Sequence, residues 1–218
     1  MENDVIHPVI EILRREISQF KVPIVTEYAQ NERNPFHILI STLLSLRTKD
    51  QTTAEASYRL LKKADTPNDM LKLSQNEIEK LIYPVGFYRV KAENIKNICQ
   101  SLVEKYQSKV PDNIDELLKF KGVGRKTANL VVTLGYNKLG ICVDIHVHRI
   151  SNRWGYIQTK NPDESEMILR KKLPKEYWIE FNDLLVTYGQ NICLPTSPKC
   201  SQCTIADYCE KVGVTKSR

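Results

Sequence analysis

The sequence has no apolar run of membrane-spanning length. Its most apolar stretch, Phe36 to Leu46, is far shorter than the roughly 20 residues that a spanning helix requires. No segment shows sustained alternation of apolar and polar residues, which argues against a sheet protein, and no internal repeat or low-complexity tract occurs. The N-terminus does not read as a signal peptide, because the helix expected after Met1 to Asp4 is too charged. We therefore expect an intracellular, all-α protein without a targeting segment.

The composition indicates a folded protein that could accept a nucleic-acid partner. Of the 218 residues, 41% are hydrophobic and 27% are charged, as in globular rather than disordered chains. This length fits one large domain or two small ones. Because no obvious linker interrupts the chain, we expect two lobes that share a cleft. The net charge of +6 permits binding to a nucleic acid without proving it.

Helix signals follow one another along the chain. Asn34 and Pro35 open a helix whose segment Phe36 to Leu44 is apolar nearly all round, so it should be the central buried helix. The last helix is expected from Glu176 to about Gln190. Helix caps are expected at Asp50, Ser74, Asn113 and Asp144, and Asn161 should open a further helix.

The segment Leu118 to Ala128 predicts a helix, a glycine turn and a second helix. Gly122 and Gly124 can each take a positive φ, and the second helix should run from Arg125 to about Tyr136. The turn would direct the backbone N–H groups of residues 122–125 outward at a helix N-terminus, which suits a phosphate. Four cations crowd the same segment: Lys119, Lys121, Arg125 and Lys126. A nucleic-acid clamp is therefore predicted, and an ordinary helical hairpin with a solvated basic tip is the alternative.

Lys126 and Asp144 are the candidates for chemistry. Neighbouring positive charge and the helix N-terminus disfavour an ammonium at Lys126, and a neutral amine can attack carbon to form a Schiff base. Lys126 could instead be another phosphate contact. Asp144 begins the next helix and could share a cleft with Lys126, or it could be a plain helix cap. His146 and His148 are interpreted as surface or DNA-contact residues, not as metal ligands.

The six cysteines fall into two groups. Cys99 and Cys142 stand alone in apolar surroundings and are expected in the core. The other four lie close together near the C-terminus, which in a reducing compartment indicates a metal site more often than disulfides. Four thiolates can hold either zinc or an iron–sulfur cube, and the single Cys-x2-Cys pair leans only modestly to iron–sulfur. These four residues are Cys193, Cys200, Cys203 and Cys209.

The motifs occur together in a combination and order that resemble those of a known protein family. They are Gly122 to Ala128 (GVGRKTA), Val143 to His146 (VDIH) and the C-terminal cysteine motif, with Leu43 to Ser45, Thr48, Gly86 to Tyr88 and Lys91 to Asn94 in the expected order. This combination closely resembles endonuclease III, the iron–sulfur member of the helix-hairpin-helix DNA glycosylases. The resemblance extends over essentially the whole chain.

The resemblance implies a two-lobed all-α fold. A helical barrel domain with the helix-hairpin-helix would cover residues 28–138, and an iron–sulfur cluster domain would combine residues 1–27 with residues 139–218. The four C-terminal cysteines would hold a [4Fe-4S] cluster. Double-stranded DNA that contains a damaged base or an abasic site would bind in the groove between the lobes. We expect the protein to act as a monomer.

The resemblance also implies an activity and residue roles. Lys126 would attack C1′ of the deoxyribose of a flipped-out oxidised or ring-saturated pyrimidine, and the resulting Schiff base would permit β-elimination. Asp144 would stabilise positive charge on the sugar and help to deprotonate Lys126. The implied DNA contacts are Arg47, Phe87, Lys121, Gly122, Val123, Gly124, Arg125, His146 and Lys199.

The chain departs from the family pattern at several implied DNA contacts, Arg47 and Phe87 among them. Arg47 stands where the family often has Gln, which leaves the preference for the opposite base open, and Phe87 replaces the usual Leu.

Other functions compete with this one. Mismatch-specific uracil or thymine glycosylases share the hairpin, the aspartate and the cluster, but they typically lack the lysine. Adenine-excising relatives usually lack it too and carry a further C-terminal domain. From another class, a non-catalytic DNA-binding module could use a four-cysteine zinc site.

Overall fold

The structure is a computed structural model that describes residues 3–20, 25–26 and 33–218. All regular elements of the described residues are helical, and no strand occurs among them, as the sequence predicts. The described helices include none that is both long and apolar enough for a membrane span. The chain divides into two compact units, one of Ile24–Gly140 and one of Met1–Pro23 with Ile141–Arg218. The lobe boundary expected between residues 27 and 28 lies outside the described residues.

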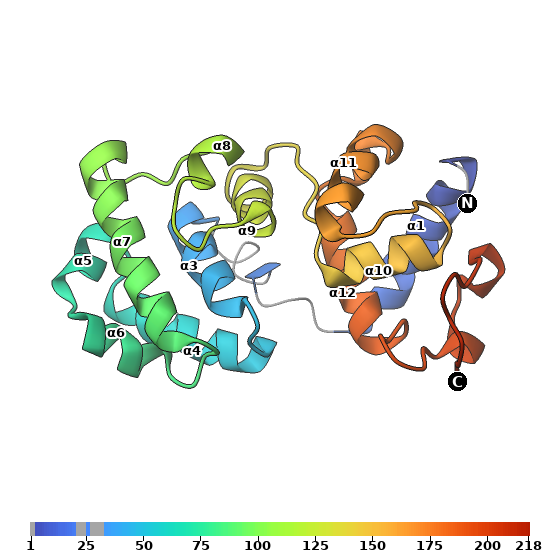
Figure 1. Ribbon diagram of the computed structural model, residues 1–218, viewed down its shortest axis with the longest axis horizontal. Coiled ribbons are helices and arrows are strands. Elements are labelled where there is room, and N and C mark those ends of the chain that lie inside the picture. Colours follow the sequence, from blue (N-terminus) through green and yellow to red (C-terminus); the bar gives the residue numbers. More distant parts are fainter. Residues whose placement is uncertain (1–2, 21–24, 27–32) are drawn as a thin grey trace. The chain divides into compact units, whose positions relative to one another are not determined.

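The unit Ile24–Gly140 is organised around the buried helix α3 (Pro35–Ser45), which packs against α4, α7 and α9 (Figure 1). Asn34 caps α3 by accepting hydrogen bonds from the backbone of Phe36 and His37, and Pro35 occupies the first turn, as predicted. The other elements are α4 (Asp50–Lys63), α5 (Pro67–Lys72), α6 (Gln75–Ile82), α7 (Tyr88–Tyr106), α8 (Ile114–Leu117), α9 (Arg125–Leu130) and the π-helical turn η1 (Val131–Gly135).

The other unit has its own core, built on α12 (Phe181–Asn191) between α1 (Asn3–Ile17) and α10 (Ile145–Arg153). Trp154 and Tyr188 are among its fully buried side chains. The remaining elements are α11 (Pro162–Lys172) and the 3-10 turns η2 (Lys175–Tyr177), η3 (Cys200–Gln202) and η4 (Ala206–Tyr208). Two separate cores mean that each unit positions its own functional side chains.

Two helix starts differ from expectation. Asp50 does not cap α4, because Lys49 is the capping residue and makes no side-chain bond, so Asp50 lies in the first turn. The last expected helix is split: Glu176 belongs to the 3-10 turn η2, and α12 starts at Phe181. The capping box at Ser74 and the caps at Asn113 and Asn161 are confirmed.

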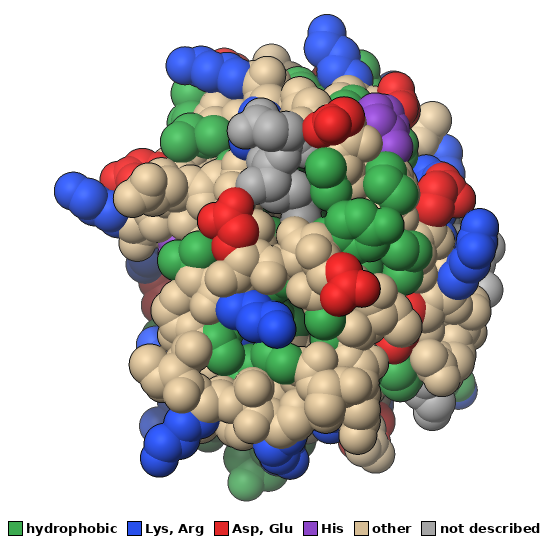
Figure 2. Space-filling model, turned by 90° about the vertical axis from the view of Figure 1, so that its right-hand side faces the viewer, with side chains coloured by type: hydrophobic (Ala, Val, Ile, Leu, Met, Phe, Trp, Pro, Cys, Tyr) green, Lys and Arg blue, Asp and Glu red, His purple; other side chains and the backbone are tan. Residues whose placement is uncertain are grey.

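Figure 2 shows the side on which both chain ends lie in Figure 1. Lys and Arg side chains on this face are spread apart, with Asp and Glu side chains among them. A polyanion such as DNA binds best where cations are concentrated. The hairpin segment, by contrast, has four cations within eight residues of the chain.

Candidate functional site

The two glycines between α8 and α9 differ in conformation. Gly122 has a φ of 87°, in the left-handed region, and a Cβ there would lie 2.5 Å from Asn94 Nδ2. Gly124 caps α9 in an extended conformation, with φ −97° and ψ 178°, and a Cβ there would meet nothing within 4 Å. Gly122 is thus required by the fold of the turn. Gly124 leaves its backbone open to an approaching group.

The four hairpin cations lie within five residues of Gly124 in the chain. Lys121 Nζ lies 2.9 Å from Glu93 Oε1 and Lys119 Nζ lies 2.5 Å from Glu116 Oε1, both on the surface. Exposed ion pairs contribute little, so a phosphate can compete for these lysines. Arg125 and Lys126 are half-buried in the first turn of α9, which continues directly into η1. The turn therefore combines backbone donors with cations at one helix start.

Asp144 is the capping residue of α10, as predicted. Its Oδ1 accepts hydrogen bonds from the backbone N–H of His146 at 2.7 Å and of Val147 at 3.0 Å. The side chain is buried, with 7% of its surface exposed. Capping and burial together fix the orientation of this carboxylate, which a charge-stabilising role also requires.

The predicted catalytic pair is distributed over the two units: Lys126 lies in Ile24–Gly140 and Asp144 in the other. His146 is half-buried, and its Nδ1 lies 3.1 Å from Arg149 Nη2. His148 hydrogen-bonds to Ser165 Oγ at 2.7 Å. Each histidine therefore has a partner within its own unit.

Arg47 and Phe87, predicted as DNA contacts, lie against each other. The guanidinium carbon of Arg47 is 4.8 Å from the centre of the Phe87 ring. Both residues are exposed and both have left-handed backbones, with φ of 56° and 58°. Left-handed conformations are costly for side chains of this size and concentrate at functional sites.

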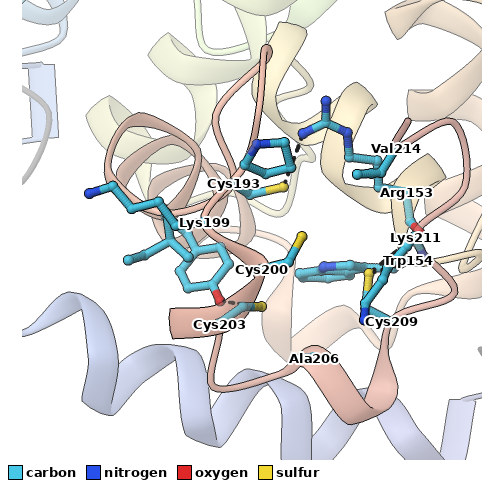
Figure 3. A pocket seen from close by; sticks show the side chains of 13 residues that line it. Arg153, Trp154, Cys193, Lys199, Cys200, Cys203, Ala206, Cys209, Lys211 and Val214 are labelled. Atoms are coloured by element: carbon cyan, nitrogen blue, oxygen red, sulfur yellow. Dashed lines mark hydrogen bonds between the residues drawn. The ribbon is translucent and has the colours of Figure 1, made fainter. Parts of the chain in front are cut away.

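The four C-terminal cysteines line one cavity (Figure 3). All four are free thiols, and Trp154, Ile192, Pro198 and Val214 supply apolar walls. Among the described residues, no three His, Cys, Asp or Glu side chains are grouped tightly enough to hold a metal ion. Four cysteines around one cavity supply the all-thiolate donor set that iron–sulfur clusters use. The donor set thus fits an iron–sulfur cluster.

The surroundings of these thiols suit thiolates bound to metal. Burial raises the pKa of the Cys203 and Cys209 thiols, so their deprotonation needs positive charge nearby. Arg153 Nη1 donates to Cys193 Sγ at 3.4 Å, and Tyr188 Oη lies 3.0 Å from Cys203 Sγ. In Figure 3 the Lys199 side chain points away from the sulfur atoms of the four cysteines.

Two arginines that are not among the predicted site residues hold the cysteine loop. Arg153 donates to the carbonyls of Leu194 at 2.6 Å and Pro195 at 2.7 Å. Arg149 donates to the carbonyl of Cys193 at 2.9 Å. Their spacing of four residues on one predicted helix, followed by a cysteine-rich segment, is the only sequence signal for this role. The two other cysteines, Cys99 and Cys142, are buried as predicted.

Comparison with known proteins places these features in one class. Residues 40–175 match the model of the HhH-GPD superfamily of base excision DNA repair proteins, and residues 193–209 match the iron-sulfur binding domain of endonuclease III. The first match contains Lys126 and Asp144, and the second begins at Cys193 and ends at Cys209. The fold and the site thus define a base-excision DNA repair protein of the helix-hairpin-helix type.

Relatives that match nearly the full length of the chain identify one family within this class. The chain is 45% identical over 203 residues to endonuclease III of Thermotoga maritima, covering 92% of each protein. A trapped endonuclease III–DNA covalent intermediate, the estranged-adenine complex, superposes with a TM-score of 0.86 at 33% identity and 97% coverage of both chains. A non-covalent endonuclease III–DNA complex gives the same TM-score and identity, with 97% of this chain and 96% of that chain covered. The chain belongs to the endonuclease III family of DNA glycosylases with AP lyase activity, which carry a [4Fe-4S] cluster.

Proposed function

We propose that this protein removes oxidised or ring-saturated pyrimidines from double-stranded DNA and then cleaves the strand at the resulting abasic site. The observation that carries the proposal is the position of Lys126 in the first turn of α9, directly after the open Gly124 backbone. A backbone that grips the phosphates beside a flipped-out nucleotide brings an amine on the next turn close to the sugar. Mismatch-specific glycosylases of the same superfamily typically lack this amine, so Lys126 favours the combined activity.

The proposed reaction uses Lys126 as the nucleophile. Its neutral Nζ forms a bond to C1′ of the deoxyribose as the bond from C1′ to the base breaks, and the base leaves with the bonding electrons. Loss of the amine proton and opening of the sugar ring give a Schiff base between Nζ and C1′. Removal of a proton from C2′ then expels the 3′ phosphate by β-elimination, and hydrolysis of the Schiff base regenerates the lysine.

Asp144 is proposed to support the first step. As positive charge develops on the sugar, a buried carboxylate held in a fixed orientation stabilises it more than water would. The same carboxylate can accept a proton from the Lys126 ammonium, which must be neutral to attack. The Oδ1 bonds to the start of α10 support a fixed orientation.

The remaining residues have binding and structural roles in this proposal. Residues 28–138 form the helical barrel domain, and residues 1–27 with 139–218 form the cluster domain. The cluster is held by Cys193, Cys200, Cys203 and Cys209; when bound, it supplies a fixed scaffold for the loop that presents Lys199 to a phosphate. Arg47, Phe87, His146, Lys199 and residues 121–125 contact DNA. We further propose a monomeric, intracellular enzyme, which free cysteines and a DNA substrate support.

The backbone contact at the hairpin can be tested at its two glycines. Gly124→Ala should change the free energy of unfolding by less than about 0.5 kcal/mol, because a Cβ there meets nothing within 4 Å. It should nevertheless weaken binding to abasic duplex DNA by about tenfold, because the methyl group keeps phosphates from the backbone N–H groups. Fluorescence anisotropy and thermal unfolding measure the two effects.

Gly122→Ala should show the opposite effect on stability. Its left-handed φ and its contact with Asn94 should cost about 1–2 kcal/mol of stability. If Gly124→Ala binds DNA as tightly as the unmodified protein, the hairpin does not grip the DNA backbone at this residue.

The substrate class is tested with a panel of duplexes that each carry one defined lesion, with the opposite base varied. Oxidised and ring-saturated pyrimidines should be excised and their strands cleaved, whereas G·T and G·U mismatches should remain intact. Denaturing gel electrophoresis separates intact strands from strands nicked 3′ to the lesion. Excision of mismatched thymine or uracil without strand cleavage would instead identify a monofunctional mismatch glycosylase.

A further inference from the structure

The side chain of Lys91, near the start of α7, is buried, with 8% of its surface exposed. Its Nζ donates hydrogen bonds to the carbonyl of Leu44 at 2.8 Å, the carbonyl of Leu46 at 2.5 Å and the hydroxyl of Thr48 at 3.2 Å. Three acceptors match the three N–H donors of an ammonium. Burial lowers its pKa to about 8, and the group remains mainly protonated at neutral pH. The Lys91 ammonium thus lies at the C-terminal end of α3, where it satisfies backbone carbonyls that have no partner within the helix.

These contacts enclose Arg47 on both sides. Leu46 precedes Arg47 in the chain and Thr48 follows it, and Lys91 Nζ binds both neighbours. The backbone N–H of Lys91 also donates to the carbonyl of Phe87 at 3.0 Å, in the first turn of α7. One residue therefore links the loop that carries Arg47 to the loop that carries Phe87.

Two further contacts tie the same loops together. The Gly86 N–H donates to the Thr48 hydroxyl at 3.1 Å, so this hydroxyl bridges Gly86 and Lys91. A Cβ on Gly86 would lie 2.7 Å from the Arg47 carbonyl oxygen, so the two backbones pass in close contact. The left-handed backbones of Arg47 and Phe87 are thus held by surrounding contacts that offset their conformational cost.

We propose that Lys91 is a positioning residue that holds Arg47 and Phe87 in one preformed arrangement for insertion into the DNA duplex. The inference rests on the proposed DNA contacts of Arg47 and Phe87. A preformed pair does not have to be ordered when DNA binds, and so it binds more tightly than two separately mobile side chains. Lys91 itself need not touch DNA.

The same helix provides a matched control. Lys96 Nζ donates to the carbonyls of Leu71 at 3.1 Å and Leu73 at 2.6 Å, and so ends α5 much as Lys91 ends α3. Neither of these carbonyls belongs to the loops of Arg47 and Phe87. Loss of the Lys96 contacts should therefore affect stability without affecting the pair.

The test compares dissociation constants for a duplex with a stable abasic-site analogue, together with thermal unfolding. Lys91→Met, which keeps the aliphatic length, should raise Kd by about tenfold, whereas Lys96→Met should change it by less than about twofold. Phe87→Ala should also weaken binding. In a protein that already carries Arg47→Ala and Phe87→Ala, Lys91→Met should cause no further loss of binding, since Lys91 acts through the pair. Thr48→Val, a milder change in the same contacts, should raise Kd by about threefold and serves if Lys91→Met does not fold.

Three results would overturn this inference. Lys91→Met could weaken binding further in a protein that already lacks both side chains through Arg47→Ala and Phe87→Ala, or Lys96→Met could weaken binding as much as Lys91→Met. Folded Lys91→Met, or Thr48→Val if Lys91→Met does not fold, could also bind DNA as tightly as the unmodified protein. A different result bears on the proposed contacts themselves: if Phe87→Ala and Arg47→Ala both bind normally, these residues do not contact DNA, and the inference fails with them.

Discussion

Lys126→Ala is expected to abolish the covalent adduct that borohydride traps between the protein and abasic DNA. It should also lower strand cleavage by on the order of 10³-fold or more, because no Schiff base can form without the Nζ amine. Alanine is a strong helix former, so α9 should persist. Gel electrophoresis of the reduced reaction measures the adduct, and anisotropy with abasic duplex measures binding, which should change by less than about tenfold.

The control for this prediction is Lys138, beyond the other end of the same helical segment. Its Nζ lies 2.5 Å from Asp112 Oδ2 on the surface. Lys138→Ala removes the same charge from the same unit but should leave the trapped adduct within about twofold of normal, since exposed pairs contribute little. Trapping by Lys126→Ala at the level of the unmodified protein would mean that another amine is the nucleophile.

Asp144→Asn is expected to lower turnover by about 10²- to 10⁴-fold while DNA binding and thermal unfolding remain near normal. Asparagine caps helices as well as aspartate does, so the bonds to the backbone of His146 and Val147 can be kept. Only the negative charge is lost. Single-turnover excision of an oxidised pyrimidine measures the first chemical step directly.

Asp144→Ala separates the cap from the charge. It removes both, so it should lose turnover to a similar extent and in addition lower the free energy of unfolding by about 1 kcal/mol. If Asp144→Asn lost binding and turnover in equal proportion, the carboxylate would have a structural role only. If Asp144→Asn kept full turnover, its charge would have no part in the reaction.

The helix starts that the sequence predicted correctly depend on contacts a few residues long. Asn34, Ser74 and Asp144 each cap a helix by accepting a hydrogen bond from the backbone two or three residues ahead. Asp50 was wrongly assigned as a cap, because the same residue type also suits the first helical turn, where its charge is favourable. The split before α12 was missed for a related reason, since apolar periodicity does not distinguish a helix from a helix interrupted by a 3-10 turn.

The candidate site was readable from the sequence wherever its residues form a compact motif. The hairpin, with Lys126 directly after its glycines, and the four-cysteine segment each lie within a short stretch of chain. Their residue types predict an amine nucleophile and a thiolate-bound metal. The sequence does not show that the fold requires glycine at residue 122 but not at residue 124. The difference arises because a side chain at residue 122 would collide with Asn94, which lies on another helix.

The sequence by itself determined the fold class, the family and the groups available for catalysis, because these depend on local spacing and residue type. Only the tertiary structure decided how Lys91 and Arg153 are used. Lys91 binds carbonyls 47 and 45 residues away, and Arg153 reaches the thiol of a cysteine 40 residues away. Such partners are chosen by the packing of whole helices, which brings distant carbonyls and thiols within hydrogen-bond distance, and no pattern along the chain records that choice.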